Sequence, residues 1–267
     1  MSENLEILIK EKTDHGVIRF TMNDSVSKNA LSKKLISLLI DELRSVSLDE
    51  SIKVIVLAAN GNVFSAGHDL KEITSARNNK DNGESFFKDL FNLCSELMQL
   101  IIKIPQPVIA EINGIATAAG CQLVASCDLA LASSESQFAT PGVNIGLFCS
   151  TPMVALSRNV NKKSAMHMLL TGDLINSEKA KDIGLINDVF QKHQLTDEVN
   201  KLAEKIATKS SMTVKIGKKA FYDQEEMDLS KAYEYTSMIM SENLLNRDAK
   251  EGIDAFLNKR SPDWKNE

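Results

Sequence analysis

Two short apolar runs near the start of the chain predict a β-hairpin. Residues 7–12 and 17–22 contain β-branched and aromatic side chains, which are frequent in strands. Between them lie residues 14–16, the sequence Asp-His-Gly, which favours a tight turn. Residues 30–46 follow with apolar side chains at spacings of three and four, as in an amphipathic helix. The chain is therefore expected to begin with two strands and one helix.

Short continuous apolar runs alternate with helical patterns in the middle of the chain. Residues 54–57 and 108–110 are wholly apolar, which indicates strands that are covered on both faces. A helical pattern over residues 86–102 separates them, and another strand-like run occupies residues 129–132. This alternation is the βαβ pattern of an α/β fold.

The last part of the chain is almost wholly helical in pattern. Beyond about Thr151 only an apolar stretch at residues 185–190 interrupts the helices. A chain of 267 residues is long enough for one large domain with a short appendage. We therefore expect one structural unit, with a core over residues 1–200 and a helical C-terminal region over residues 201–267.

Composition and charge exclude several kinds of partner. The fractions of hydrophobic (43%) and charged (25%) residues are those of a globular protein. A net charge of -5 supplies no general positive field for nucleic acid or anionic lipid. Apolar runs such as residues 35–40 are too short to span a bilayer, and the acidic start, residues 1–6, resembles neither a signal nor a transit peptide. We expect no nucleic-acid partner, no membrane partner and a cytoplasmic location.

Motifs for metals, nucleotides and serine hydrolysis are missing from the sequence. The four cysteines form no CxxC pair, and none of the four histidines stands at zinc-ligand spacing from them. Neither GxGxxG nor GxxxxGK[ST] occurs, and there is no GxSxG elbow. No metal and no separate cofactor are therefore expected.

Two loops rich in small residues carry the candidate chemistry. Residues 64–72 follow the first buried strand and open a helix, and Asp69 and Glu72 have the spacing of a capping box. Residues 113–122 follow the next buried strand and lead into a helical stretch at residues 123–126. Free N–H groups at a helix start suit a developing oxyanion. Taken alone, the first loop is a weak signal, because a capped helix start also explains it. Close packing of small residues explains the second loop as well as an oxyanion site does.

Together the two loops resemble the enoyl-CoA hydratase/isomerase (crotonase) family. The resemblance covers nearly the whole chain and rests on Asn-Ala-Leu at 29–31, Ala-Gly-His-Asp at 66–69, Pro-Val-Ile-Ala at 107–110, Asn-Gly at 113–114, Cys-Asp-Leu-Ala at 127–130, residues 138–146, and Glu-Gly-Ile-Asp-Ala-Phe at 251–256. Three segments, residues 66–70, 138–143 and 146–151, are similar to one subgroup of that family.

The resemblance implies a fold, an assembly and a binding mode. The fold would be a crotonase-like spiral of ββα and βαβ turns, with a helical C-terminal region that builds a homotrimer or a dimer of trimers. The ligand would be an acyl-CoA thioester, with its carbonyl between the backbone N–H groups of His68 and Ala119. The implied contacts of its CoA part are Lys28, Ala66, Asp69 and Lys71, together with Phe256 and Lys259 of a neighbouring subunit. For each lysine, a solvated surface charge is the competing interpretation.

The sequence departs from the family at the positions of its two catalytic glutamates, which hold Gln122 and Gly142. An amide takes no proton at physiological pH and glycine has no side chain. General acid–base assistance is worth about 10²–10⁴ in rate, and a backbone oxyanion donor about 10²–10³. Efficient hydration is therefore not expected, whereas polarisation of the thioester is preserved.

Ser150, preceded by Cys149, occupies a third family position that is an aspartate in some relatives. Its hydroxyl could lie near the acyl chain, but capping of the next helix is the favoured interpretation. For His68, a backbone role is better founded than a side-chain role.

Two functions from different classes remain open. The first is an enzyme of fatty-acid or acyl-CoA metabolism that acts through a stabilised thioester enolate, such as a decarboxylase, an isomerase or a weak lyase. The second is a catalytically silent acyl-CoA binder with a regulatory or assembly role. RNA binding is disfavoured by the acidic balance.

Overall fold

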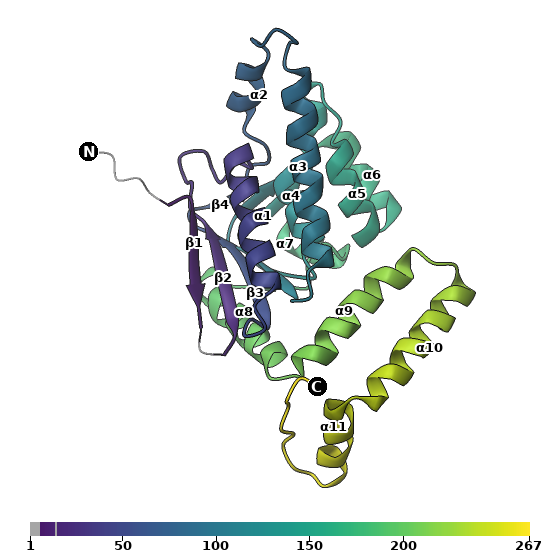
Figure 1. The fold of residues 1–267 in the computed structure, drawn as a ribbon. Coiled ribbons are helices and arrows are strands. Elements are labelled where there is room, and N and C mark those ends of the chain that lie inside the picture. Colours follow the sequence, from purple (N-terminus) through teal and green to yellow (C-terminus); the bar gives the residue numbers. More distant parts are fainter. Residues whose placement is uncertain (1–5, 14) are drawn as a thin grey trace.

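The computed structural model describes residues 6–13 and 15–267 (Figure 1). The chain begins with the predicted hairpin, in which β1 (Leu8–Lys12) pairs antiparallel with β2 (Val17–Met22). Asp14 of the predicted turn and residues 1–5 of the acidic start lie outside the described residues.

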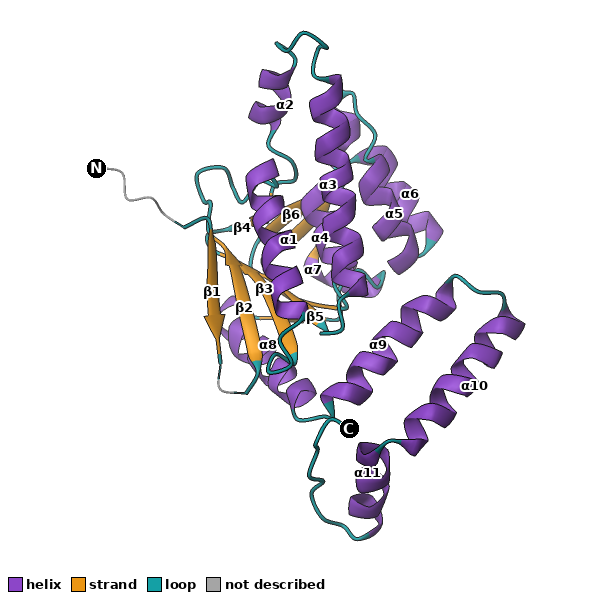
Figure 2. Cartoon of the chain, in the orientation of Figure 1, coloured by secondary structure: helices purple, strands orange, loops and turns teal. Residues whose placement is uncertain are grey.

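After the hairpin, the chain alternates between two sheets (Figure 2). The first sheet has the order β1-β2-β3-β5-β7-β10, with β3 (Val54–Ala59), β5 (Val108–Ile112), β7 (Leu129–Ser133) and β10 (Asp188–Phe190). The second has the order β4-β6-β8-β9, with β4 (Val63–Ser65), β6 (Ile115–Thr117), β8 (Gln137–Ala139) and β9 (Ile175–Asn176). From β3 to β8, successive turns therefore add a parallel strand to each sheet in alternation, which confirms the predicted spiral, whereas β9 pairs antiparallel with β8.

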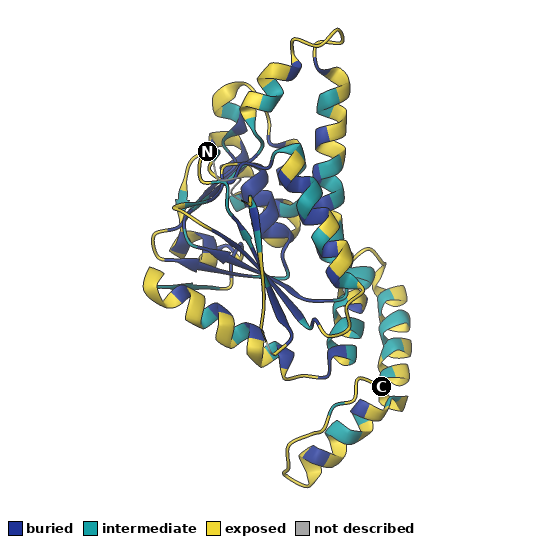
Figure 3. Ribbon diagram, turned by 60° about the vertical axis from the view of Figure 1, so that its left-hand side comes forward, coloured by how far each residue is buried: buried dark blue, intermediate teal, exposed yellow. Residues whose placement is uncertain are grey.

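Helices cover both faces of the six-stranded sheet. One side carries α1 (Lys33–Ser47), α3 (Glu84–Lys103) and α4 (Ala119–Ser126), and the other carries α8 (Lys192–Ala207). All six residues of β3 are buried, as expected for a strand covered on both faces (Figure 3). The remaining helices of the core are α2 (Leu70–Ala76), the 3-10 helix η1 (Pro141–Ile145), α5 (Ser150–Asn159), α6 (Lys162–Thr171) and α7 (Ser177–Asp182).

Three further helices form an arm that leaves the core: α9 (Ser211–Glu225), α10 (Leu229–Leu245) and α11 (Arg247–Leu257) (Figure 1). The predicted division at residue 200 falls within α8, which packs on the sheet, and the arm begins with α9. Among the described helices, none is long and apolar enough to cross a membrane.

Two predicted elements differ from those observed. Helix α4 begins at Ala119 instead of Leu123, because the small residues 119–121 continue the helix inside the core. Of the apolar stretch at residues 185–190, only Asp188–Phe190 forms a strand, while Leu185 and Ile186 are buried in the core.

Candidate functional site

The structure brings the two small-residue loops into direct contact. Gly67 has φ 88°, and a Cβ on it would lie 2.9 Å from Cβ of Ala118 and 3.3 Å from the backbone nitrogen of Ala119. A Cβ on Gly120 would lie 2.3 Å from the carbonyl oxygen of Ser65. Side chains at either glycine would therefore force the loops apart, and glycine also tolerates the left-handed backbone of residue 67.

Two backbone N–H groups, those of His68 and Ala119, are available at this contact. Among the described residues, neither group has a hydrogen-bond acceptor. Ala119 is the first residue of α4, so its N–H carries part of the positive end of the helix dipole. The preceding residue, Ala118, has φ 51° and ψ -119°, and its N–H donates to the carbonyl of Ala139 at 2.9 Å. A non-glycine residue in this rare conformation is typical of a functional turn.

The imidazole of His68 is fixed next to its own backbone N–H. Its Nδ1 lies 3.1 Å from the carbonyl oxygen of Leu31, which can only accept, so Nδ1 carries the proton. Its ring packs edge-on against Phe91 of α3 at a centroid distance of 5.4 Å. Nε2 is buried and has no hydrogen-bond partner among the described residues. Burial lowers the pKa of His68, although the bond to Leu31 opposes this, so the ring is neutral at physiological pH.

Gln122 lies inside α4, one turn after Ala119, and is buried. Its Oε1 lies 4.0 Å from Sγ of Cys94, which comes three residues after Phe91 on α3. Burial raises the pKa of Cys94 to about 12, so the thiol is neutral. The amide oxygen of Gln122 thus has an uncharged thiol beside it.

Gly142 lies in η1 and is closed in by the segment that follows it. A Cβ at this position would be 2.9 Å from Sγ of Cys149 and 2.9 Å from the carbonyl oxygen of Leu147. Burial raises the pKa of Cys149, although its contact with the backbone of Gly142 opposes this, so the thiol is not an activated nucleophile. A side chain at position 142, where the resemblance expects the second family glutamate, would therefore require Leu147 or Cys149 to move.

Ser150 does not cap α5, and this prediction was wrong. The helix begins at Ser150 itself, and Cys149 is the capping residue, without a side-chain bond. Ser150 is exposed, and its hydroxyl donates to the carbonyl of Phe148 at 3.4 Å. The helix therefore starts one residue earlier than a cap at Ser150 would require.

Four of the residues expected to contact CoA lie together at the start of α2. The N–H of Ala66 donates to the carbonyl of Lys28 at 3.1 Å. Asp69 caps α2 and accepts from the N–H of Lys71 at 2.7 Å. Only half of the predicted capping box forms, because Glu72 accepts from the N–H of Lys33 instead of bonding back to residue 69. Lys28 and Lys71 have exposed side chains.

The other two expected contacts, Phe256 and Lys259, are not part of this group. They lie at the end of α11, at the opposite end of the molecule from α2 (Figure 1). Phe256 is 83% exposed. These residues could serve only the site of a second copy, as the family resemblance implies.

Sequence reasoning missed Phe91, Cys94 and Leu31, which contact the predicted site residues. The helical spacing over residues 86–102 puts Phe91 and Cys94 on one face, yet gives no sign of what that face contacts. Within the described part of the chain, no group of three histidine, cysteine or acidic side chains is arranged to hold a metal.

Known proteins share the sequence pattern and the fold of this chain. A model of the family described as enoyl-CoA hydratase/isomerase matches residues 12–267. Enoyl-CoA hydratase domain-containing protein 3, mitochondrial, from Xenopus laevis is 47% identical over 251 residues, covering 94% of this chain and 84% of that protein. The mitochondrial description of this relative gives no support to the cytoplasmic location expected from the sequence.

Two solved structures are also similar. Human enoyl-CoA hydratase domain-containing protein 3 has a TM-score of 0.92 at 44% identity, covering 97% of this chain and 100% of that one. An enoyl-CoA hydratase of Mycobacterium smegmatis has a TM-score of 0.92 at 43% identity, covering 97% and 99%. The human protein belongs to the subgroup of the family that residues 66–70, 138–143 and 146–151 resemble. The predicted similarity to this subgroup is therefore confirmed. The chain therefore belongs to the enoyl-CoA hydratase/isomerase, or crotonase, family.

Proposed function

We propose that the chain binds an acyl-CoA thioester and polarises its carbonyl oxygen between the N–H groups of His68 and Ala119. The observation that carries this proposal is the contact between the two loops. It brings together two N–H groups that have no acceptor among the described residues, one of them at a helix start. Such an arrangement stabilises negative charge on an oxygen and supports enolate formation at the neighbouring carbon.

The reaction would be an isomerisation, a decarboxylation or a weak lyase reaction of acyl-CoA metabolism, without efficient hydration. Each backbone donor is worth about 10²–10³ in rate, so polarisation alone can support substantial chemistry. Water addition also needs groups that move protons, and Gln122 and Gly142 offer none. The neutral thiol of Cys94 beside Gln122 and the closed position of Gly142 support this restriction.

A catalytically silent acyl-CoA binder is the second candidate. It is favoured by the packing at Gly142, where Cys149 and Leu147 take the room that a catalytic side chain would need. A screen for turnover with a panel of acyl-CoA thioesters separates the two candidates, since both require the same binding.

The CoA part would bind across the start of α2, near Lys28, Ala66, Asp69 and Lys71. Two exposed ammonium groups on this surface suit the CoA phosphates. Phe256 and Lys259 of a second copy would complete the contact. This requires self-association, as a homotrimer or a dimer of trimers.

Thermal unfolding with hexanoyl-CoA and with hexanoate tests the binding. At a free concentration about 100 times Kd, the thioester should raise Tm by about 5–10 °C, whereas hexanoate should leave Tm unchanged because it lacks the CoA groups. Equal shifts from the two ligands would refute the assignment.

A proline at position 119 tests the oxyanion role directly. Ala119 is the first helical residue, so Ala119→Pro removes the N–H without breaking a bond inside α4. The φ of 51° and ψ of -119° at Ala118 are unfavourable before proline, so the variant should also lose stability, and Tm is measured beside turnover. Any turnover should fall by at least about 10². Lys162→Pro, at the first residue of α6, is the matched control and should leave turnover unchanged. Full turnover in the Ala119→Pro protein would rule out this mechanism.

A further inference from the structure

Helix α11 has few apolar contacts of its own with the rest of the chain. Among the described residues, its buried members are only Asp248 and Ala255. Ile253, Phe256 and Leu257 are 52%, 83% and 72% exposed. Helices usually dock on the rest of a protein by burying apolar side chains. The position of α11 must therefore be fixed by other contacts.

The chain reverses after α11 and returns along it. Lys259 has φ 50°, a left-handed conformation that ends the helix, and the segment from residue 258 to 267 runs back toward the core (Figure 1). We call residues 258–267 the C-terminal strap.

Asp248 binds the end of this strap. Its Oδ1 and Oδ2 accept the N–H groups of Lys265 and Asn266, each at 2.9 Å, and its own N–H donates to the carbonyl of Glu267 at 3.0 Å. Asp248 is only 1% exposed. Hydrogen bonds to a buried carboxylate are among the stronger ones, and losing one leaves an unpaired buried group.

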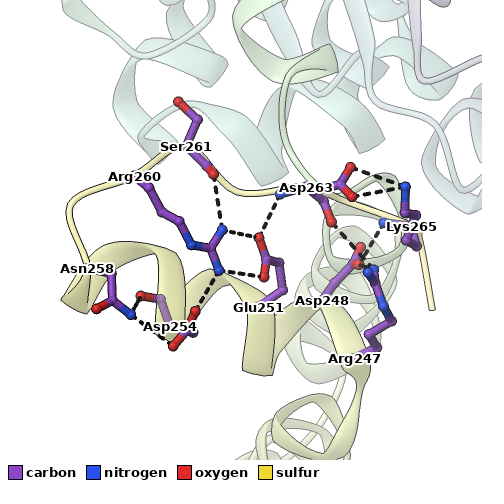
Figure 4. A network of polar contacts seen from close by, with 9 residues as sticks. All are labelled: Arg247, Asp248, Glu251, Asp254, Asn258, Arg260, Ser261, Asp263 and Lys265. Atoms are coloured by element: carbon purple, nitrogen blue, oxygen red, sulfur yellow. Dashed lines mark hydrogen bonds and ion pairs between the residues drawn. The ribbon is translucent and has the colours of Figure 1, made fainter.

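A second set of contacts binds the beginning of the strap to α11 (Figure 4). Arg260 forms two bonds to Glu251, at 2.6 and 2.9 Å, and one to Asp254 at 2.6 Å. Glu251 also accepts the N–H of Asp263 at 2.7 Å. The bidentate geometry fixes where the chain turns back.

The strap also contacts the junction between α8 and α9. Asn266 Oδ1 accepts from the N–H of Ser211 at 2.9 Å and from its hydroxyl at 2.8 Å. The indole N–H of Trp264 donates to the carbonyl of Thr208 at 2.9 Å. The same indole lies over Gly252 of α11, where a Cβ would be only 3.0 Å from Cη2. The strap thus connects α11 to the core.

We propose that the C-terminal strap holds α11 against the α8–α9 junction through the carboxylate of Asp248. It thereby presents Phe256 and Lys259 in a fixed orientation to a second copy of the chain. The strap itself is a property of one chain, whereas the presentation to a second copy rests on the self-association in the proposed function.

Hydrogen exchange of the full chain tests the strap without any ligand. Asp248→Asn places an amide N–H₂ against backbone N–H donors, so exchange of residues 248–257 should accelerate by about tenfold or more, with core strands unchanged. Asn266→Gly leaves Asp248 in place, tolerates the left-handed backbone of residue 266 (φ 62°) and removes the side-chain bonds to Ser211, so it should accelerate the same amides less. It also keeps the test available if the first variant fails to fold. Asp182→Asn, an exposed carboxyl in α7, is the matched control.

Sedimentation of the same proteins tests the presentation to a second copy. The assembly of Asp248→Asn should weaken by at least about tenfold. Unchanged exchange of α11 in both strap variants would overturn the strap. Faster exchange with unchanged assembly would overturn the presentation. A monomeric wild type would contradict the self-association in the proposed function, while the exchange result would still decide whether the strap exists.

Discussion

Single atoms decide what the candidate site can accommodate. Gly67 and Gly120 allow the two loops to touch, and Gly142 allows the chain to fold tightly against Cys149. In each case a Cβ would meet another atom at 2.9 Å or less, which is closer than normal packing allows.

Gly67→Ala should therefore disrupt both the fold and the site. Alanine at φ 88° costs roughly 1–2 kcal/mol, and the clash with Ala118 adds to it, so unfolding free energy should fall by at least about 2 kcal/mol. Gly217→Ala is the control, because position 217 lies inside α9 with nothing within 4 Å of its Cβ. It should gain about 0.5–1 kcal/mol. Urea unfolding of both variants makes the comparison, and equal effects would contradict the contact between the loops.

Gln122→Glu should introduce weak hydration of crotonyl-CoA, by up to about 10²-fold over the native chain. The two side chains are nearly the same size, and burial at position 122 should raise the pKa of the new carboxyl. Adding Gly142→Glu should give no further gain and should lower stability, because the new Cβ meets Leu147 and Cys149.

Loss of the absorbance of the enoyl thioester measures this hydration, with Tm as the control for folding. Robust hydration by the native chain would contradict the proposed lack of acid–base groups. His68, Cys149 and Ser150 would then be the first residues to test as its source.

At the scale of elements, helix α9 joins the arm to the core through one buried cluster. Nζ of Lys218 donates to the carbonyls of Ile101 and Gln106 at 2.8 and 2.9 Å and pairs with Asp128 at 2.7 Å. Asp128 also accepts from the hydroxyl of Tyr222 and from the N–H of Val108. The cluster ties α9 to the end of α3, to β5 and to the turn before β7.

Lys218→Met should lower the unfolding free energy by about 3 kcal/mol, because it leaves a largely buried carboxylate and two carbonyls without their cation. The neighbouring Lys219→Met removes an exposed pair with Asp223 and should change stability by no more than about 0.5 kcal/mol. Chemical denaturation monitored by circular dichroism provides both values. If the two variants proved equally stable, the cluster would not be what holds α9.

At the scale of the whole molecule, the arm presents an apolar surface away from the core. The side of α10 that faces α9 includes Tyr235, whose hydroxyl donates to Asp223 at 2.9 Å. A separate stripe of α10 residues is 51–74% exposed: Leu229, Tyr233, Met240 and Leu244. Their spacing of four, seven and four residues places them on one helix face. Contiguous exposed apolar surface of this kind indicates an interface.

Met240→Glu should weaken self-association by at least about tenfold, because it would bury a charge in the contact, while leaving Tm of the isolated chain unchanged. Ser241→Glu, on the same helix but outside the stripe, is the control and should assemble normally. Sedimentation equilibrium measures both. Normal assembly of the Met240→Glu protein would show that this stripe is not the interface.

The sequence by itself determined the hairpin, the buried strands β3, β5 and β7, the long helices and the family. Periodicity and composition of consecutive residues report whether a segment is covered on one face or both, and these properties are local. Motif order alone proposed His68, Ala119, Gln122 and Gly142 as site positions, without knowledge of their contacts.

Only the tertiary structure decided the second sheet, the surroundings of the site and the strap. Strands β4, β6, β8 and β9 have two or three residues each, too few for a periodic pattern. The contacts of Phe91 with His68 and of Cys149 with Gly142, and the start of α5 at Ser150, depend on how successive turns of the spiral stack. Asp248 and Asn266 likewise meet residues that are distant in sequence. Such contacts are set by packing in three dimensions, which leaves no local signal in the chain.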